Sequence, residues 1–253
     1  RYADNVAELM IHRLARLPAP QRDVLRIASA AGSRCDNGVL QRVLGRAPGT
    51  AVQALIAAGF LLSSQSGLGF VHDRVQEAAY QLTPGHEREA LHARIAVAML
   101  GAWPDRLQAL LFEIAHQLQR ASPCGFAAND CATFLQLTYE AAQRARDSRA
   151  YEQAAGYLHT AQQLLEACST LESRATLGFA IASMAPECDL QPSRTVAAQA
   201  RLAECRQRAR PTLERARVCQ LQAPLETLQG NCQAAIASPP GRLRTLGLGP
   251  RPG

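Results

Sequence analysis

The segment "FLLSSQSGLGFV", residues 60–71, interrupts the helical periodicity that surrounds it. Two short apolar runs, residues 60–62 and 68–71, flank a turn of serine, glutamine and glycine. Apolar runs joined by a short glycine-containing connection are typical of a β-hairpin. The sequence therefore predicts one small hairpin near residues 60–71 in a chain that is otherwise mainly α.

Three short helical segments precede the hairpin: "PQRDVLRIASAAG", "DNGVLQRVLG" and "PGTAVQALIAAG". They end on Gly32, Gly45 and Gly59, and glycine suits the left-handed position that follows a helix. Three short helices followed by a hairpin is the order of a winged-helix unit. Further helices lead to a break at Trp103 and Pro104, so we predict a winged-helix-like first domain over residues 1–103.

Residues 104–253 have the pattern of paired helices that alternate small and large apolar residues. Ala154 and Ala161 lie where two antiparallel helices would need to approach closely. A weaker copy of this pattern places Gly230 and Ala235 five residues apart, and the repeat length is near 40 residues. We predict a helical-repeat solenoid similar to tetratricopeptide (TPR) repeats in this second domain.

The charge balance gives little support for nucleic-acid binding. The formal net charge is +6, and every basic residue is arginine because the chain has no lysine. The arginines are scattered among acidic residues, as in Glu87-Arg88-Glu89, so no basic stripe is evident. With 47% apolar and 19% charged residues, the composition is that of a soluble globular protein.

The eight cysteines include no C-x-x-C pair and no nearby histidine at the spacing of a metal site. We therefore expect buried thiols in a reducing compartment, and hence a cytoplasmic protein. No apolar run approaches the ~20 residues that span a bilayer, and we expect neither a secretory leader nor a membrane partner. The chain starts at Arg1 rather than methionine, and we expect a fragment of a longer protein.

The motifs of the common nucleotide-dependent and hydrolytic enzymes are missing. A G-x-x-x-x-G-K-[ST] phosphate loop requires lysine, and the chain has none. Kinase motifs and a G-x-S-x-G nucleophile motif are also absent. We predict that this chain has no catalytic residues and binds no cofactor of its own.

His72 and Asp73 are the candidate functional pair, in the segment "GLGFVHDRVQEAAYQL" of residues 67–82. They stand where a strand would end and a helix would begin. In one interpretation the pair caps the helix and the histidine packs in the core; in the other it contacts a ligand. We expect four other histidines to be surface or interhelical residues: His86, His92, His116 and His159.

Several segments carry a family resemblance: "LPAPQRDVLRIASAAGSRCD", "GFVHDRVQEAAYQLTPGHEREALHARIAVAML", "LFEIAHQL" and "RAYEQAAGYLHTAQQLL". With the tail "GNCQAAIASPPGRLRTLGLG" they cover nearly the whole chain. The chain resembles the region that follows the nucleotide-binding core in large bacterial signal-transduction ATPases of the STAND class. In such proteins the ATPase is often joined to a serine/threonine kinase domain and a sensor histidine kinase.

The resemblance implies a role for His72 and Asp73. In STAND proteins a histidine-aspartate pair in the winged-helix unit can contact the diphosphate of ADP and stabilise a closed state. A helix N-terminus favours phosphate through its free N–H groups and its dipole. Val71 departs from the family pattern, in which methionine usually precedes the pair. The ATP or ADP would be held by the ATPase core, which lies outside this chain.

These observations predict a non-catalytic regulatory and protein-interaction segment of a cytoplasmic signalling ATPase. Its partners would be its own ATPase core, the flanking kinase domains and an unknown protein on the helical repeats. The alternative is a winged-helix DNA-binding transcriptional regulator, for which the predicted recognition helix offers Gln53 alone. A third possibility is an enzyme that uses His72 and Asp73 for acid/base chemistry.

Overall fold

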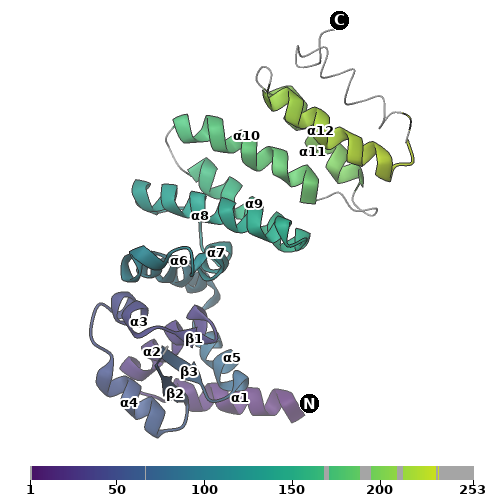
Figure 1. Ribbon diagram of the computed structural model, residues 1–253. Helices are drawn as coiled ribbons and strands as arrows, with labels where there is room; N and C mark the ends of the chain where they lie inside the picture. The colour runs from purple at the N-terminus through teal and green to yellow at the C-terminus, as the bar shows by residue number, and fades with distance from the viewer. Residues whose placement is uncertain are drawn as a thin grey trace, which may run out of the picture. The chain divides into compact units, whose positions relative to one another are not determined.

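The computed structural model describes residues 2–65, 67–167, 171–188, 195–209, 213–231 and 233. These residues form a mainly α structure with one small three-stranded sheet. The chain divides into two compact units, Arg1–Phe126 and Ala127–Gly253 (Figure 1). The predicted pair of residues Gly230 and Ala235 falls partly outside the described residues, because Ala235 is not among them.

The first unit contains seven α-helices and three strands among its described residues. They are α1 (Tyr2–Ala15), α2 (Ala19–Ala31), β1 (Arg34–Cys35), α3 (Asn37–Leu44), α4 (Gly49–Ala57), β2 (Leu61–Ser64), β3 (Gly67–Phe70), α5 (Asp73–Gln81), α6 (Gly85–Ala102) and α7 (Leu111–Arg120), with a 3-10 turn at Pro104–Arg106. Local chemistry sets several of these bounds. The Asp36 carboxylate accepts hydrogen bonds from the Gly38 and Val39 N–H groups and so caps α3. Gly45 ends the same helix in the left-handed conformation, as its position in the sequence predicts.

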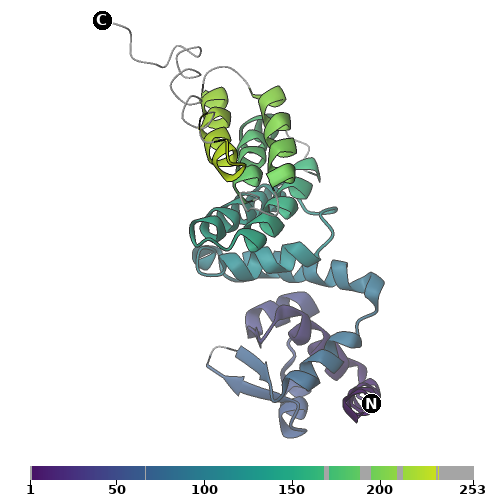
Figure 2. The same ribbon diagram turned by 90° about the vertical axis from the view of Figure 1, so that its right-hand side faces the viewer.

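The predicted hairpin is confirmed, and the sheet has one more strand than expected. β2 and β3 pair antiparallel, from Leu61 opposite Phe70 to Ser64 opposite Gly67, and both strands extend away from the helices (Figure 2). β1 pairs with the other edge of β3. A two-residue strand has no alternation to detect, so the sequence did not reveal it. Gly67 permits this pairing, because a Cβ there would lie 2.4 Å from the Cys35 carbonyl oxygen.

Helix α2 is the centre of the first unit, since it packs against α3, α4, α5, α6 and β1. Its apolar side chains, among them Val24, Leu25 and Ile27, are buried. Burial of such side chains contributes about 1.5–3 kcal/mol each. The C-terminal end of α2 is buried in the same core.

A chain of side-chain amides and an imidazole satisfies the carbonyl groups at that end of α2. Gln117 on α7 donates from Nε2 to the Ala30 and Ala31 oxygens at 3.0 and 3.2 Å. Its Oε1 lies 2.7 Å from Nδ1 of His92, and the Tyr80 hydroxyl lies 2.9 Å from Nε2 of the same ring. Because the Gln117 oxygen can only accept, Nδ1 carries the proton and Nε2 accepts from Tyr80.

This network places α7 in the first unit, beyond the predicted domain boundary. The predicted interruption of the helix near Trp103 and Pro104 is present, because α6 ends at Ala102 and a 3-10 turn begins at Pro104. However, α7 then packs back on α6, and its Gln117 reaches α2. The division between the two compact units falls between Phe126 and Ala127. The sequence gives no sign of the long-range contact between Gln117 and α2.

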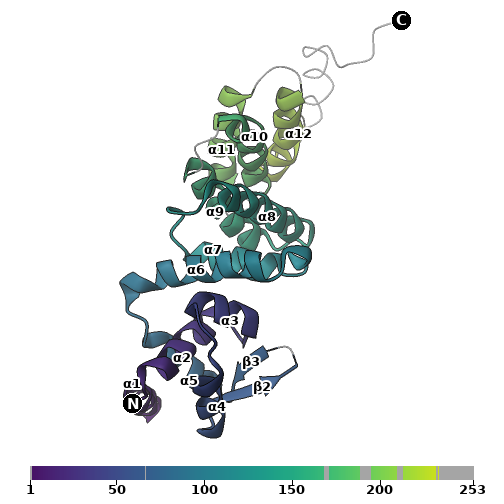
Figure 3. The same ribbon diagram turned by 90° about the vertical axis from the view of Figure 1, so that its left-hand side faces the viewer.

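The second unit contains five described helices: α8 (Ala128–Asp147), α9 (Tyr151–Ala167), α10 (Leu171–Cys188), α11 (Thr195–Arg208) and α12 (Leu213–Leu228). Each packs against the next along the chain, and α10 also contacts α12 (Figure 3). Ala154 and Ala161 have no exposed surface. The second unit is therefore built from contacts between helices that are close in sequence.

Helices α8 and α12 end in the same hydrogen-bonding pattern. After α8, the N–H groups of residues 148, 149 and 150 bond to the carbonyls of residues 144, 146 and 145. After α12, residues 229, 230 and 231 bond to residues 225, 227 and 226 in the same way. Arg149 and Gly230 both adopt positive φ, of 62° and 79°. The two positions are 81 residues apart (230 − 149), about twice the predicted repeat length.

The cysteines follow the prediction in part. Cys35, Cys188 and Cys205 are buried and belong to no disulfide, whereas Cys124 is exposed. Cys131 is disulfide-bonded, which the prediction of free thiols missed. A disulfide depends on which residues the fold brings together, so the spacing of cysteines along the chain does not exclude one.

Burial lowers the pKa of His92 below its usual value of 6.5, because an imidazolium would lose its hydration. The Gln117 hydrogen bond acts in the opposite direction, and the charges of Arg120, His116 and Arg88 lower the pKa further. The folded chain consequently resists protonation of His92.

We expect the free energy of unfolding to fall as the pH decreases below about 6.5. In that range the unfolded chain binds a proton at His92 and the folded chain does not. Urea melts between about pH 5 and 7 would measure this slope. His92→Gln should flatten it, leaving a contribution from His116, whose pKa is lowered by partial desolvation and by the charge of Arg120. The control His86→Gln changes an exposed ring and should keep the full slope; equal slopes in all three proteins would contradict the assignment.

Leucine at Ala154 or Ala161 should destabilise the second unit by ~1–3 kcal/mol, because both sites are fully packed. Ala167→Leu, at an exposed position of the same helix, is the matched control. Equal melting temperatures for the variants at the buried alanines and for Ala167→Leu would disprove this packing.

Arg149→Gly should stabilise the second unit by ~0.5–1 kcal/mol, since glycine adopts positive φ without the clash of a Cβ. The neighbouring Ser148, with φ of −83°, provides the control. Ser148→Gly should lower stability by up to ~1 kcal/mol. The opposite ranking in denaturant melts would show that the Arg149 side chain outweighs its backbone strain.

Candidate functional site

His72 and Asp73 lie at the junction between β3 and α5, as predicted. His72 occupies the position before the first helical residue, with extended backbone, and its side chain makes no capping hydrogen bond. Both side chains are exposed. The interpretation of His72 as a core histidine is therefore wrong.

Three features hold this junction in place. The His72 carbonyl accepts the N–H groups of Val75 and Gln76 and so starts α5. Val75 is buried on the inner face of the helix. The Gln76 amide donates to the Gly32 oxygen at 2.9 Å, which ties the first turn of α5 to the end of α2. These contacts hold the backbone of His72, which carries the imidazole, in a defined position.

The junction can offer hydrogen-bond donors to an anion. The first N–H groups of a helix have no acceptor within that helix, and those of Asp73 and Arg74 take these positions in α5. The imidazole can add a further donor. The Asp73 carboxylate favours the helix terminus, and within the described part of the chain no hydrogen bond or ion pair joins it to the His72 ring. Asp73 therefore makes no hydrogen bond through which it would orient the His72 ring.

The other histidines do not join His72. His92 is buried in the network between α5, α6 and α7, whereas His86, His116 and His159 are exposed. Among the described residues, no group of three or more histidine, cysteine or acidic side chains could hold a metal ion. Burial raises the pKa of the Cys35 thiol to about 12, so this thiol stays protonated near neutral pH.

The helix that would read DNA in the alternative hypothesis presents few polar groups. On α4 the side chains of Thr50, Gln53 and Ala57 are exposed, while Val52 and Leu55 are buried. Readout of base edges relies on arginine, asparagine or glutamine side chains. This helix supplies one such side chain, Gln53, and its apolar face forms part of the core.

A groove that the sequence did not reveal lies in the second unit. It has a volume of about 580 Å³ and is formed by α9, α10, α11 and the first turn of α12. Its lining includes apolar residues such as Leu158, Phe179 and Ile181, together with acidic ones such as Glu204 and Glu214. Four helices contribute to it, so no local pattern could have identified these residues as neighbours.

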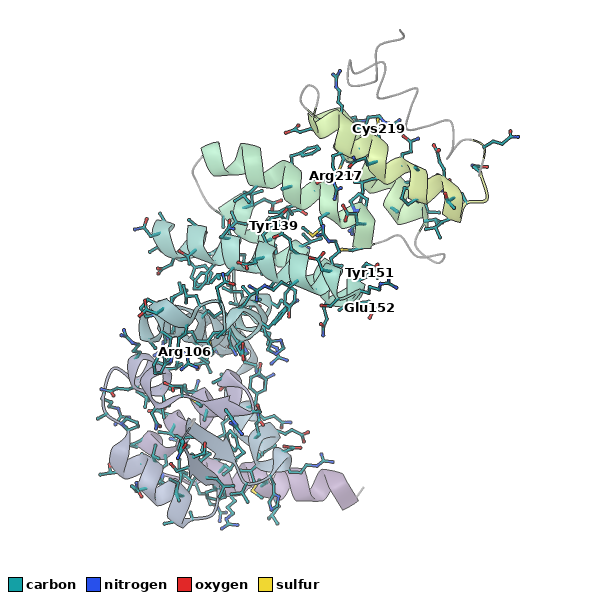
Figure 4. All side chains as sticks on the ribbon, in the orientation of Figure 1. Arg106, Tyr139, Tyr151, Glu152, Arg217 and Cys219 are labelled. Carbon is teal, nitrogen blue, oxygen red and sulfur yellow. The ribbon has the colours of Figure 1, made fainter. Side chains whose placement is uncertain are left out.

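A smaller hollow of about 370 Å³ contains an ion-pair cluster. Glu187 on α10 forms ion pairs with Arg146 on α8, at 3.3 Å, and with Arg217 on α12. Figure 4 labels Arg217 and the nearby Tyr139. Arg146 also pairs with Asp147 at 2.8 Å. Two guanidinium groups therefore face two carboxylates, and the charge is balanced. Burial raises the pKa of the nearby Tyr139 hydroxyl, which remains neutral. This cluster connects three helices and has no excess charge with which to bind an ion.

No described helix is both long enough and apolar enough to cross a membrane. Comparisons of the chain with protein-family models, with curated proteins and with solved structures gave no match in any of the three.

Proposed function

We propose that this chain is a non-catalytic regulatory segment of a cytoplasmic signalling ATPase of the STAND class. In this proposal the first unit restrains an ATPase core that precedes it in the full-length protein. The second unit binds a protein partner, and flanking kinase domains transmit the signal. The observation that carries the proposal is the exposed imidazole of His72 at the N-terminus of α5.

The order of elements supports a winged-helix interpretation of the first unit. The sequence α2, β1, α3, α4, β2, β3, with β3 in the middle of the sheet, is the order of helices and strands in such units. The apolar inner face of α4 and its single exposed amide, on Gln53, favour a role in packing over DNA readout.

The packing of the second unit supports a TPR-like interpretation. Consecutive helices pair, and α8 and α12 share one capping pattern at a spacing of two repeats. In a repeat array of this kind α8 and α10 would each be the first helix of a pair, and α9 and α11 the second. Such arrays present extended surfaces for proteins.

The proposed mechanism is a difference in contact between two states. In the closed state the His72 ring and the N–H groups of the α5 terminus would donate hydrogen bonds to the diphosphate of ADP, which the ATPase core holds. In the open state the same ring would contact water. A contact made in one state alone can shift the equilibrium between them.

His72→Ala in the full-length protein should accelerate ADP release by roughly ten- to a hundredfold, since a hydrogen bond to a charged group contributes about 1.5–3 kcal/mol. The matched control is His86→Ala, which removes another exposed histidine of the same unit. In the isolated chain, His72→Ala should change the free energy of unfolding by less than ~0.5 kcal/mol, because the ring makes no capping hydrogen bond.

Stopped-flow release of a fluorescent ADP analogue and thermal melts would measure the two effects. An unchanged ADP off-rate in a well-folded His72→Ala protein would end the sensor hypothesis. The reading frame upstream of Arg1 provides an independent check, because the proposal requires a phosphate-binding loop there.

A further inference from the structure

The contact between Tyr80 on α5 and His92 on α6 depends on which ring nitrogen carries a proton. Among the described residues, His92 is the one histidine without exposed surface. Its Nδ1 lies 2.7 Å from Oε1 of Gln117, and its Nε2 lies 2.9 Å from the Tyr80 hydroxyl. Because the Gln117 oxygen can only accept, Nδ1 donates to it and the Tyr80 hydroxyl donates to Nε2. The Tyr80 hydrogen bond in this direction therefore requires an unprotonated Nε2.

A proton on Nε2 would disturb one of these two contacts and leave the other in place. An imidazolium ring has two N–H donors and no acceptor. The bond from Nδ1 to Gln117 would keep its direction. At Nε2, however, the N–H group and the Tyr80 O–H group would face each other as two donors. The conflict therefore arises on the α5 side of the ring.

The charged groups that act on the His92 ring add to this conflict. They are Arg88 on α6, and His116 and Arg120 on α7, and each of them disfavours a further positive charge at His92. Burial acts in the same direction, because a charged ring would lose its hydration. A protonated His92 would therefore be repelled from two helices and would gain from contact with water.

The charged side chains on the other helices of this region have contacts of their own. Arg26 on α2 pairs with Glu87, and Arg74 pairs with Glu77 on the exposed side of α5. Arg42 on α3 lies against the C-terminal end of α6, more than two turns beyond His92. The electrostatic environment of His92 is therefore set mainly by the three cationic groups on α6 and α7.

The two partners of His92 differ in how firmly they are held. Gln117 is 1% exposed, and its amide also donates to the Ala30 and Ala31 carbonyl groups of α2. Tyr80 is partly exposed, and helix α5 ends one residue after it. The end of α5 can therefore separate from the ring at a smaller cost than α7 can.

We propose that the Tyr80–His92 contact is a pH-sensitive switch, in which protonation of His92 releases the C-terminal end of α5 while α7 stays bound through Gln117. The neutral ring holds the end of α5 against α6. The protonated ring opens this contact to water without unfolding the rest of the first unit. This inference goes beyond the proposed function, and the helix on which it acts is the one that begins at the His72 junction.

Native-state hydrogen exchange of the intact chain, in low urea between about pH 5 and 7.5, tests the switch. After correction for the intrinsic chemistry, exchange of the amides of residues 80–83 should accelerate by up to about tenfold per pH unit below about 6.5. Urea should change this rate little, because a local opening exposes little surface. The amides of residues 116–120 in α7 should stay protected.

Three results would each overturn the proposal. The first is an exchange rate at the end of α5 that does not depend on pH. The second is a urea dependence equal to that of global unfolding, since the opening would then not be local. The third is loss of protection in α7 while α5 stays protected, which would place the opening on the Gln117 side of the ring.

Two variants connect the opening to this contact. His92→Gln has no proton to gain and should abolish the pH dependence at the end of α5, whereas the exposed control His86→Gln should keep it. Tyr80→Phe provides the test if the His92 variant does not fold. At pH 7.5 it should accelerate exchange at the end of α5 by about two- to tenfold, with α7 unchanged, because the hydroxyl that closes the contact is gone. A pH dependence retained in His92→Gln, or unchanged exchange in Tyr80→Phe, would refute the assignment.

Discussion

The first unit depends on how the buried carbonyl groups at the end of α2 find hydrogen-bond donors. The last carbonyls of a helix have no partner within it, and leaving them bare in a core would cost about 1–3 kcal/mol each. Gln76 from α5 and Gln117 from α7 supply the donors. The same two amides fix α5 against α2 and draw α7 into the unit. The Gln76 amide that satisfies a carbonyl at the end of α2 therefore also sets the orientation of the His72 junction at the start of α5.

The sequence predicts local structure best where a residue type strongly favours one backbone conformation, as glycine does after a helix. Gly45 ends α3 with positive φ, and the hairpin lies within the predicted residues 60–71. β1 escaped notice because its two residues pair with Gly69 and Leu68, more than thirty positions away. The contact of α7 with α2 escaped notice for a related reason, since Gln117, which makes it, belongs to a residue type that is usually found on the surface.

The candidate sites show the same division. The position of His72 before a helix followed from the sequence, but its exposure did not, because a histidine at that point is compatible with either the core or the surface. His92 had no sequence motif and proved to be the buried centre of a network. The groove brings together Phe179, Glu204 and Glu214 from three helices, and nothing in their spacing along the chain predicts that meeting.

The packing of each helix of the second unit on its neighbours in sequence has a consequence for how the two units fold. Contacts between adjacent helices close short loops, so the second unit has a low contact order and can form pair by pair. The first unit must bring residue 34 to residue 69 before β1 can join the hairpin of β2 and β3. During synthesis, the helices of the second unit would therefore assemble progressively as they leave the ribosome. The first unit would wait until α7 had emerged, because Gln117 completes the network around α2.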